Sequence, residues 1–559
     1  MEKRVLAAIA LSISILFAFR YYEERQAAKL AGQRPAAGQP APVVPAPEAP
    51  AAATPVPAAV PALPLPAEES VSEQRIVVEG DLYRAVLDNR GGVLTSWLLK
   101  KYKSAKGEIF DMVSATHMEQ RPYPGSLEYD DPKLTAAANQ ENYVVELPAG
   151  RSDAAPLTAP VTVVLRLRRG DMLIEKSFHF EADNYIVALD TTAQRGGQPL
   201  IGRILLGQDI GPEQEHLLNP SIVLRAVYDL NGKVQREAPP KGENEVKSIS
   251  GNILWAGLDM QYFAAIAIPS KPMAEFRIQH KVVQTAGLGG AQVSRSLIPL
   301  TIPAAGSTSY RLYLGPKSQT YLEAIPGANL SAVIDYGMFS IIVRPLLFGL
   351  QFIDQYSHNY GLAIILLTFV LTLLLFPFRF KQMISMKKMQ VLQPKIKEIQ
   401  EKYKRYKKTD PKRAEMNQEV MAVYKENKVN PLGGCLPMIL QMPLLFAFYS
   451  LLAYSMELRQ APFYGWIHDL SMKDPLYILP IVMGITMLIS QKMTPMSPGA
   501  DPTQAKMMMI MPVVFTIFFL NVSSGLNLYF LCSNVFQIAF QKIAERWVGD
   551  RQKVRKSKV

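Results

Sequence analysis

Cysteine is almost absent from this chain of 559 residues, which contains only Cys435 and Cys532. Both lie in apolar stretches in the last third of the sequence, and the long region before them has none. Disulfide bonds, structural zinc and a thiol nucleophile are therefore excluded from that region.

Charge is absent from five apolar stretches, which are 362–378, 435–455, 476–491, 507–520 and 525–541. A bilayer core needs about 20 predominantly apolar residues for each tilted helix, and a charge at its centre costs several kcal/mol. The stretches therefore predict a polytopic α-helical membrane domain.

Histidine is missing from the same stretches. All six histidines lie outside them, at His117, His179, His216, His280, His358 and His468, and no HExxH sequence occurs. An intramembrane protease needs Ser with His, paired Asp or a metal motif, and a transporter usually needs ionisable groups at a selective site. We therefore expect that the protein is not an enzyme and has no catalytic residue, metal or cofactor. A membrane transporter or channel is kept as the alternative to the function inferred below.

Positive charge is concentrated in residues 379–428 and in the C-terminal tail, and it sets the expected topology. By the positive-inside rule both regions are cytoplasmic. An apolar run over 5–19 follows Lys3 and Arg4 without a small-x-small cleavage pattern. We interpret it as an uncleaved anchor rather than a cleaved signal peptide. An even number of crossings is then needed, and six satisfies it, with both termini cytoplasmic.

The segment 336–356 is apolar but contains Arg344 and Pro345 and is bounded by Asp335 and Asp354. If this segment crossed the membrane, the basic residues 379–428 would lie outside the cytoplasm, against the positive-inside rule. We therefore predict an amphipathic helix in the outer interface, and a helix packed under the preceding domain is the alternative.

The region before the apolar stretches has β-type patterning. Residues 26–68 are rich in Ala and Pro and predict a tether. Between 161 and 180, apolar and polar residues alternate on both sides of Gly170-Asp171, which predicts a hairpin. Asn231-Gly232 predicts a second hairpin. One large β-rich domain is expected here.

The basic region has a helical pattern of its own. A heptad seam runs through Met389, Leu392, Ile396, Ile399, Tyr403 and Tyr406, and a second helix after Asp410-Pro411 carries Met416, Val420 and Val423. Together they predict a two-helix hairpin. It is either a spacer between spans or a docking arm whose basic faces meet ribosomal RNA.

These observations give a division of the chain. The expected units are 1–22 signal-anchor transmembrane helix, 23–69 Pro/Ala-rich linker, 70–330 exported β-rich domain, 334–357 interfacial helix, 360–379 second transmembrane helix, 380–430 basic cytoplasmic hairpin, 432–456, 475–492, 507–520 and 525–541 third to sixth transmembrane helices, and 542–559 basic cytoplasmic tail.

Several motifs resemble the YidC/Oxa/Alb family of membrane protein insertases, in its Gram-negative form. They are Asn430-Pro431-Leu432-Gly433-Gly434-Cys435-Leu436-Pro437-Met438-Ile439-Leu440-Gln441-Met442-Pro443, Leu392-Gln393-Pro394-Lys395-Ile396, Glu457-Leu458-Arg459-Gln460-Ala461-Pro462-Phe463, Trp466-Ile467-His468-Asp469-Leu470-Ser471 and Ser524-Gly525-Leu526. The anchor, tether and exported β domain extend the similarity to the whole chain.

The resemblance implies insertion and folding of newly made inner-membrane proteins, alone or with the Sec translocon. It implies a five-helix core around a hydrophilic groove open to cytoplasm and lipid, and a periplasmic domain that is all-β and β-supersandwich-like. The implied partners are nascent membrane proteins, the ribosome, the Sec translocon with its accessory subunits, and the lipid bilayer, without a small-molecule substrate.

A groove of this kind needs polar, uncharged walls, because a peptide group without hydrogen bonds in hydrocarbon costs several kcal/mol. The spans supply Thr368, Thr372, Gln441, Thr516, Asn527, Ser533, Asn534 and Gln537. Each of them is alternatively a hydrogen-bonding contact to a neighbouring helix.

The chain departs from the family at one groove position. The family usually has an arginine in the second span, and Thr372 stands in its place. Arg379 lies two turns further on, roughly 10 Å toward the cytoplasm, and we expect it at the groove mouth.

Overall fold

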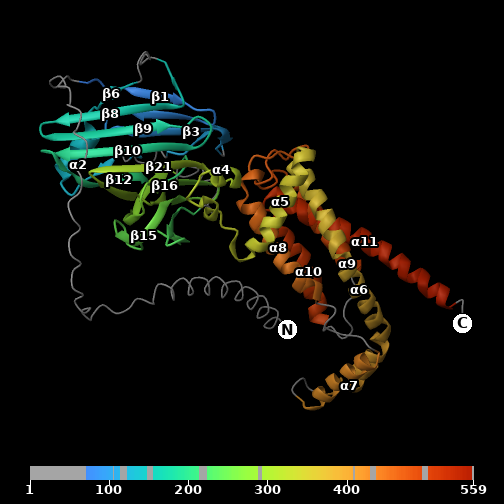
Figure 1. The fold of residues 1–559 in the computed structure, drawn as a ribbon. Helices are drawn as coiled ribbons and strands as arrows, with labels where there is room; N and C mark the ends of the chain where they lie inside the picture. Colours follow the sequence, from blue (N-terminus) through green and yellow to red (C-terminus); the bar gives the residue numbers. More distant parts are fainter. Residues whose placement is uncertain are drawn as a thin grey trace, which may run out of the picture.

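The computed structural model describes residues 71–104, 106–113, 123–147, 155–212, 223–286, 292–406, 410–427, 436–493 and 502–556. The anchor expected over 1–22, the linker expected over 23–69 and the motif residues 430–435 lie outside these ranges. The described residues form a β domain, 71–335, and a helical domain, 336–556 (Figure 1).

Among its described residues, the β domain has a five-stranded sheet with the order β4-β3-β2-β1-β7. Its strands are β1 (Arg75–Glu79), β2 (Tyr83–Asp88), β3 (Val93–Lys103), β4 (Ile109–Asp111) and β7 (Leu157–Thr158). β1 pairs with β7 in parallel, and β1 to β4 pair antiparallel in succession.

A larger sheet of 14 strands is the second layer of the described β domain. Its main path is β5-β12-β20-β17-β15-β16-β21-β10-β9-β8-β6. The strands on it are β5 (Leu127–Glu128), β6 (Val144–Glu146), β8 (Val161–Arg169), β9 (Met172–Phe180), β10 (Ile186–Arg195), β12 (Ile201–Gly207), β15 (Val246–Asp259), β16 (Phe263–Pro269), β17 (Met273–Gln279), β20 (Leu300–Ala305) and β21 (Ser307–Pro316). The strands beside the path are β11 (Gln198–Pro199), β13 (Arg225–Leu230) and β14 (Lys233–Glu237), and β18 (Lys281–Ala286) and β19 (Gln292–Leu297) pair separately.

Both predicted hairpins are confirmed. β8 and β9 pair with Arg169 opposite Met172, so Gly170-Asp171 is the two-residue loop. Asn231 and Gly232 both have positive φ between β13 and β14, as a type I′ turn requires. Along β8 the side chains of Val161, Val163, Leu165 and Leu167 are buried, so the predicted alternation faces the core.

The core of the β domain lies where the two sheets face each other. Trp97 of β3 stacks on Tyr83 of β2 with ring centroids 4.0 Å apart, and Phe180 of β9 lies 6.3 Å from Trp97. All three rings are fully buried. Aromatic side chains with this much buried area dominate core energetics, so this stack joins the small sheet firmly to the large one.

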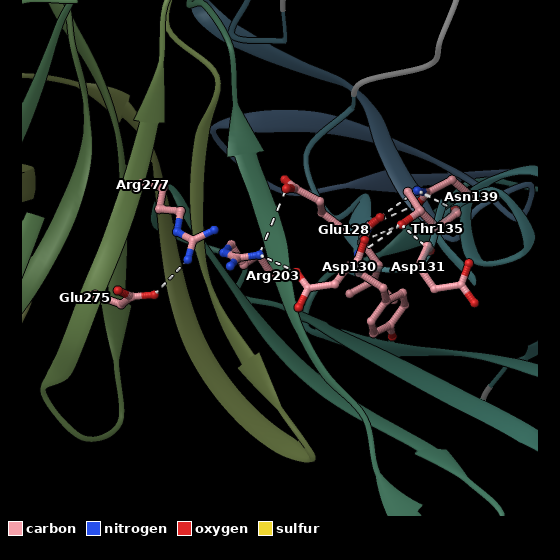
Figure 2. Close-up of polar contacts among 10 residues, drawn as sticks. Glu128, Asp130, Asp131, Thr135, Asn139, Arg203, Glu275 and Arg277 are labelled. Carbon is pink, nitrogen blue, oxygen red and sulfur yellow. Dashed lines mark hydrogen bonds and ion pairs between the residues drawn. The ribbon is translucent and has the colours of Figure 1, made fainter. Parts of the chain in front are cut away.

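Polar side chains join neighbouring elements near β5, the end strand of the large sheet (Figure 2). Arg203 of β12 reaches Glu128 of β5 at 4.0 Å and Asp130 at 3.7 Å. Asn139 of α2 (Pro132–Gln140) donates to the carbonyl of Leu127 and accepts from its N–H. These contacts hold α2 against the sheet edge.

The helical domain follows a short connection through α4 (Gln319–Glu323), η3 (Leu330–Val333) and η4 (Gly337–Phe339). Its further elements are α5 (Ser340–Ser357), α6 (Tyr360–Lys402), α7 (Lys412–Glu426), α8 (Leu436–Tyr454), η6 (Met456–Leu458), α9 (Ile478–Met493), α10 (Pro502–Phe519) and α11 (Ser524–Lys556). Figure 1 shows α5 beside the β domain and α7 at the opposite end of α6.

α6 differs from the sequence expectation of a span followed by a separate helix. It is a single helix of 43 residues that continues through Pro377 and Pro394. The residues between these prolines include Lys, Gln and Met, which favour helix, and they include no glycine. No residue between 377 and 394 therefore ends the helix locally. Met389, Leu392 and Ile396 of α6 pack with Tyr424, Val420 and Val423 of α7, which confirms the predicted two-helix hairpin.

Among the described residues, two helices are long and apolar enough to cross a membrane, Gly337–Ser357 and Tyr360–Ser385. Shorter apolar helices cover Met442–Tyr454, Ile478–Met493 and Ile510–Phe519. The first of the long helices is the segment that the sequence analysis placed in the interface.

Candidate functional site

Two threonines lie buried on the side of α6 that faces the other helices. Thr368 donates its hydroxyl to the carbonyl of Ile364 at 2.6 Å, and Thr372 donates to the carbonyl of Thr368 at 2.7 Å. Each hydroxyl thus bonds one turn back in its own helix. Each hydroxyl proton is therefore donated within α6. The lone pairs of the hydroxyl oxygens can still accept a hydrogen bond from an N–H group of a substrate segment.

α11 packs beside α6 and carries the next polar groups. Phe369 and Phe536 lie 5.4 Å apart between ring centroids, and Phe376 and Phe540 lie 5.2 Å apart. Ser533 is buried on α11 and accepts from Gln537 Nε2 at 2.9 Å. The structure therefore brings the predicted residues of α6 and α11 onto two adjacent helices.

Asn534 faces a different neighbour. Its Nδ2 lies 3.4 Å from Thr486 Oγ1 on α9, and Gln541 Nε2 donates to the carbonyl of Met493 at 2.8 Å. These two contacts link α11 to α9, which is the helix-linking role that the sequence analysis named as the alternative. Thr486 was not singled out from the sequence, since an isolated threonine in a span carries no signal.

Asn527 closes the turn between α10 and α11. Its side chain is fully buried, and its Nδ2 is shared among the carbonyls of Phe519, Val522 and Ser523 at 3.2 to 3.3 Å. The carbonyl of Phe519 also accepts from the N–H of Val522, and that of Ser523 accepts from the N–H of Asn527, so the Asn527 side chain adds a further donor to the turn. Asn527 therefore shapes the hairpin of α10 and α11.

Thr516 of α10 lies against Gly484 of α9. Its hydroxyl donates to the carbonyl of Pro512 at 2.7 Å. A Cβ built on Gly484 of α9 would stand 2.1 Å from Thr516 Oγ1, so any larger residue at 484 would force the Thr516 side chain to move. α8 includes Gln441, but its side chain lies outside the described part of the structure.

Arg379 is half-buried on α6, and it interacts electrostatically with Tyr529 of α11. Tyr529 is buried and stacks on Phe448 of α8 with ring centroids 4.0 Å apart. Side chains on a helix lean toward its N-terminus, so this guanidinium extends back along α6 into the bundle. Sequence reasoning missed Tyr529, because its partner is 150 residues away.

Comparisons with known proteins cover nearly the whole chain. The family model described as "60Kd inner membrane protein" matches residues 352–551, and the model "YidC periplasmic domain" matches residues 75–348. The chain is 37% identical over 496 residues to "Membrane protein insertase YidC" of Syntrophus aciditrophicus (strain SB), covering 86% of both chains.

Another relative, "Membrane protein insertase YidC" of Geotalea daltonii, is 36% identical over 559 residues. The alignment covers 97% of this chain and 98% of the relative. Among solved structures, "Active YidC insertase crystal structure with the first transmembrane domain resolved" matches 84% of this chain and 92% of its own, at 17% identity and a TM-score of 0.36.

Proposed function

Because this chain belongs to the YidC family of membrane protein insertases, it inserts membrane proteins into the lipid bilayer. We propose that it does so along a polar path in its helical domain, to which the apolar stretches contribute only uncharged side chains and at whose mouth Arg379 lies. The path runs between α6 and α11, with α8 and α9 beside them. It uses no cofactor and forms no covalent intermediate.

The observation that carries the proposal is the set of buried polar groups on adjacent helices that hold no Arg or Lys within the apolar stretches. A polar segment crossing hydrocarbon leaves its peptide groups without hydrogen bonds, at several kcal/mol for each group. Buried hydroxyls such as those of Thr368, Thr372 and Ser533 offer acceptors along part of the way. The polar groups thereby shorten the unsolvated stretch for any polar segment.

Six crossings are part of the proposal, with both termini in the cytoplasm and the β domain, in a supersandwich-like form, in the periplasm. This topology is supported by the course of α6, a single helix that runs from the end of the helical domain near the β domain to α7 at the opposite end (Figure 1). The basic hairpin and the β domain then lie on opposite sides of the inner membrane. The unit boundaries given under the sequence analysis belong to the same proposal.

α5 lies in the outer interface in this topology, although its length would allow it to cross. Phe348, Phe352 and Tyr356 form an exposed aromatic row, with centroid separations of 6.5 and 5.3 Å. An apolar face of aromatic residues is typical of a helix that lies in the interface with this face toward the lipid. A second crossing at α5 would also place α7 on the same side as the β domain.

The proposed partners beyond the substrate are the ribosome and the Sec translocon. The lysines and arginines concentrated in residues 379–408 and in the tail support binding to ribosomal RNA, which releases counterions and weakens with salt. Removal of residues 548–559 should then reduce both ribosome affinity and its salt dependence.

The test of the function is depletion of the protein followed by an insertion assay of small one-span and two-span membrane proteins. We expect both substrates to remain uninserted. Normal insertion, together with solute flux through vesicles that contain only the purified protein, would favour the transporter or channel instead.

The topology has its own test by cysteine labelling of intact, energised cells. A reagent added from outside should reach single cysteines placed at Ser72 and Asp469, but not at Thr409 or Ser557. Labelling at Thr409 would overturn the six-span arrangement without touching the insertase function.

A further inference from the structure

The two domains meet in a short segment far from the peptide that joins them. The chain passes from the β domain to the helical domain near residue 336, yet the main polar contacts between the domains are made by residues 456–460, directly after α8. We name this segment the connector. Met456, Arg459 and Gln460 contact the β domain, whereas Glu457 and Leu458 contact the helical domain.

The connector joins two hydrophobic cores within a single turn. Met456 is buried in the core cluster of the β domain, whereas Leu458, two residues later in η6, is buried in the core cluster of the helical domain. Glu457 between them accepts from Gln351 of α5 at 3.2 Å. A turn of three residues is therefore fixed by three different parts of the molecule.

Arg459 lies over an aromatic cluster of the β domain. Its guanidinium carbon is 5.5 Å from the ring centroid of Phe110, 5.1 Å from that of Tyr262 and 5.0 Å from that of Phe263. Phe110 and Phe263 are themselves stacked at 4.1 Å and fully buried. A guanidinium is attracted by aromatic faces within about 6 Å, and more strongly where water is excluded.

Side-chain hydrogen bonds to the backbone of β3 add direction to this contact. Arg459 donates to the carbonyl of Lys103 at 3.0 Å. Gln460 donates to the same carbonyl at 2.6 Å and accepts from the N–H of Lys103 at 3.1 Å. Lys103 is the last residue of β3, so the side chains of Arg459 and Gln460 bond to the end of that strand.

The β domain also reaches the end of α8. Gln261 donates its side-chain Nε2 to the carbonyl of Ala453 at 2.8 Å. The last carbonyls of a helix lack partners within the helix. The β domain therefore provides a C-terminal cap for α8 from the neighbouring domain.

We propose that the β domain acts as a brace for α8: through the connector it holds the outer end of this helix and thereby sets its position in the helical domain. α8 packs against α5, α6 and α11. A helix fixed at its outer end by a large folded domain can move freely only at its other end. The brace confines the opening of the path to the side away from the β domain.

The test is hydrogen exchange of the amides at 450–455 in the full-length protein in lipid nanodiscs. The double variant Arg459→Ala with Gln460→Ala should exchange there at least about tenfold faster than the unmodified protein, because the opening of a helix end is governed by its local contacts. The matched control is Arg195→Ala on β10, which removes an exposed ion pair between Arg195 and Asp171. This change should leave the exchange at 450–455 unchanged.

Unchanged exchange at 450–455 in a double variant whose β domain is folded, as judged by its near-UV circular dichroism, overturns the brace. If the double variant does not fold, Gln261→Ala decides instead. It removes only the cap on Ala453, and the brace requires faster exchange at the end of α8 in this variant too. Neither measurement depends on insertion, so the brace can fail while the proposed function stands.

Discussion

In the β domain, polar side chains cross between elements and pair there. Lys317 bonds Asp259 at 2.7 Å, Arg236 lies between Asp259 and Asp335, and Arg295 pairs with Asp209. In the helical domain, the hydroxyls of Thr368, Thr372 and Thr516 bond back within their own helices. One domain uses its polar groups to fix elements to one another, and the other keeps many of its groups local.

This difference matches the solvent that each domain meets. A water-soluble domain buries polar groups only when they are paired, and such pairs specify one arrangement of strands. The hydrophobic effect does not drive the helices of the other domain together within lipid. Because few polar bonds link these helices, they can move relative to one another. We infer that the β domain is the rigid part and the helical domain the adaptable part.

The largest effect should come from the aromatic core of the β domain. Trp97→Ala removes a fully buried ring that stacks on Tyr83, and it should lower the free energy of unfolding by about 3–5 kcal/mol. Phe518→Ala, on the exposed side of α10, is the matched control and should cost far less. Calorimetry of the full-length protein in detergent measures both, and equal losses would contradict the comparison.

A smaller loss is expected at the turn between α10 and α11. Asn527→Ala leaves the carbonyls of Phe519, Val522 and Ser523 without the shared donor, at about 2 kcal/mol. Asn534→Ala removes one long contact to Thr486 and should cost well under half as much. Thermal unfolding of the two variants compares them, and a larger loss for Asn534→Ala would show that bonds between helices dominate.

Lys176 provides a pH-dependent test of the rigid part. Burial lowers the pKa of Lys176 to about 7, although the carbonyls of Gly91, Gly92 and Gly125 accept from its amine at 2.6 to 3.1 Å. Between that pKa and the ordinary lysine value the unfolded chain binds the extra proton. The free energy of unfolding should therefore rise with pH in this window, by at most about 1.4 kcal/mol per pH unit.

The measurement is urea unfolding of the unmodified protein and of Lys176→Met from pH 7.5 to 9.5. The difference between the two proteins should change with pH in the stated direction. A constant difference would show that the three carbonyls keep the ammonium charged and leave its pKa near the ordinary value.

The smallest effect is expected at the position where an arginine is missing. Thr372→Val keeps the shape of the side chain and removes a hydroxyl that bonds within α6. The change in stability should stay below about 0.5 kcal/mol, and insertion should stay within about twofold. A large loss of insertion from this single change would mean that one hydroxyl, rather than a set of polar groups, defines the path.

Local signals in the sequence were sufficient for the hairpins and for the helical hairpin of α6 and α7. The inward position of Lys176 was not predicted, although it shares the alternation of Ile174 and Phe178. The order of the large sheet was not predicted, since β5, β12 and β20 pair across long separations. The continuity of α6 was not predicted either: the helix runs through the boundary drawn between 379 and 380, since Pro377 does not end it.

The residues of the site could be predicted from the sequence, but their positions relative to one another could not. The sequence supplied the polar residues of the spans, but it could not show that Thr516 faces Gly484 or that Asn534 faces Thr486. The connector was visible only as part of a motif. Its partners Phe110, Tyr262 and Phe263 lie about 200 residues or more earlier, and no periodicity links them to Arg459.

The central claim is that uncharged polar groups in the helical domain carry substrates across. The combined variant Thr372→Leu, Gln441→Leu and Asn534→Leu tests it in an insertion assay. A matched control changes three residues on the exposed side of the helices, Val370→Leu, Val514→Leu and Ile517→Leu. We predict that the polar variant accumulates in the membrane but no longer inserts substrates, while the control inserts them normally. Insertion at the normal rate by the polar variant would contradict the account.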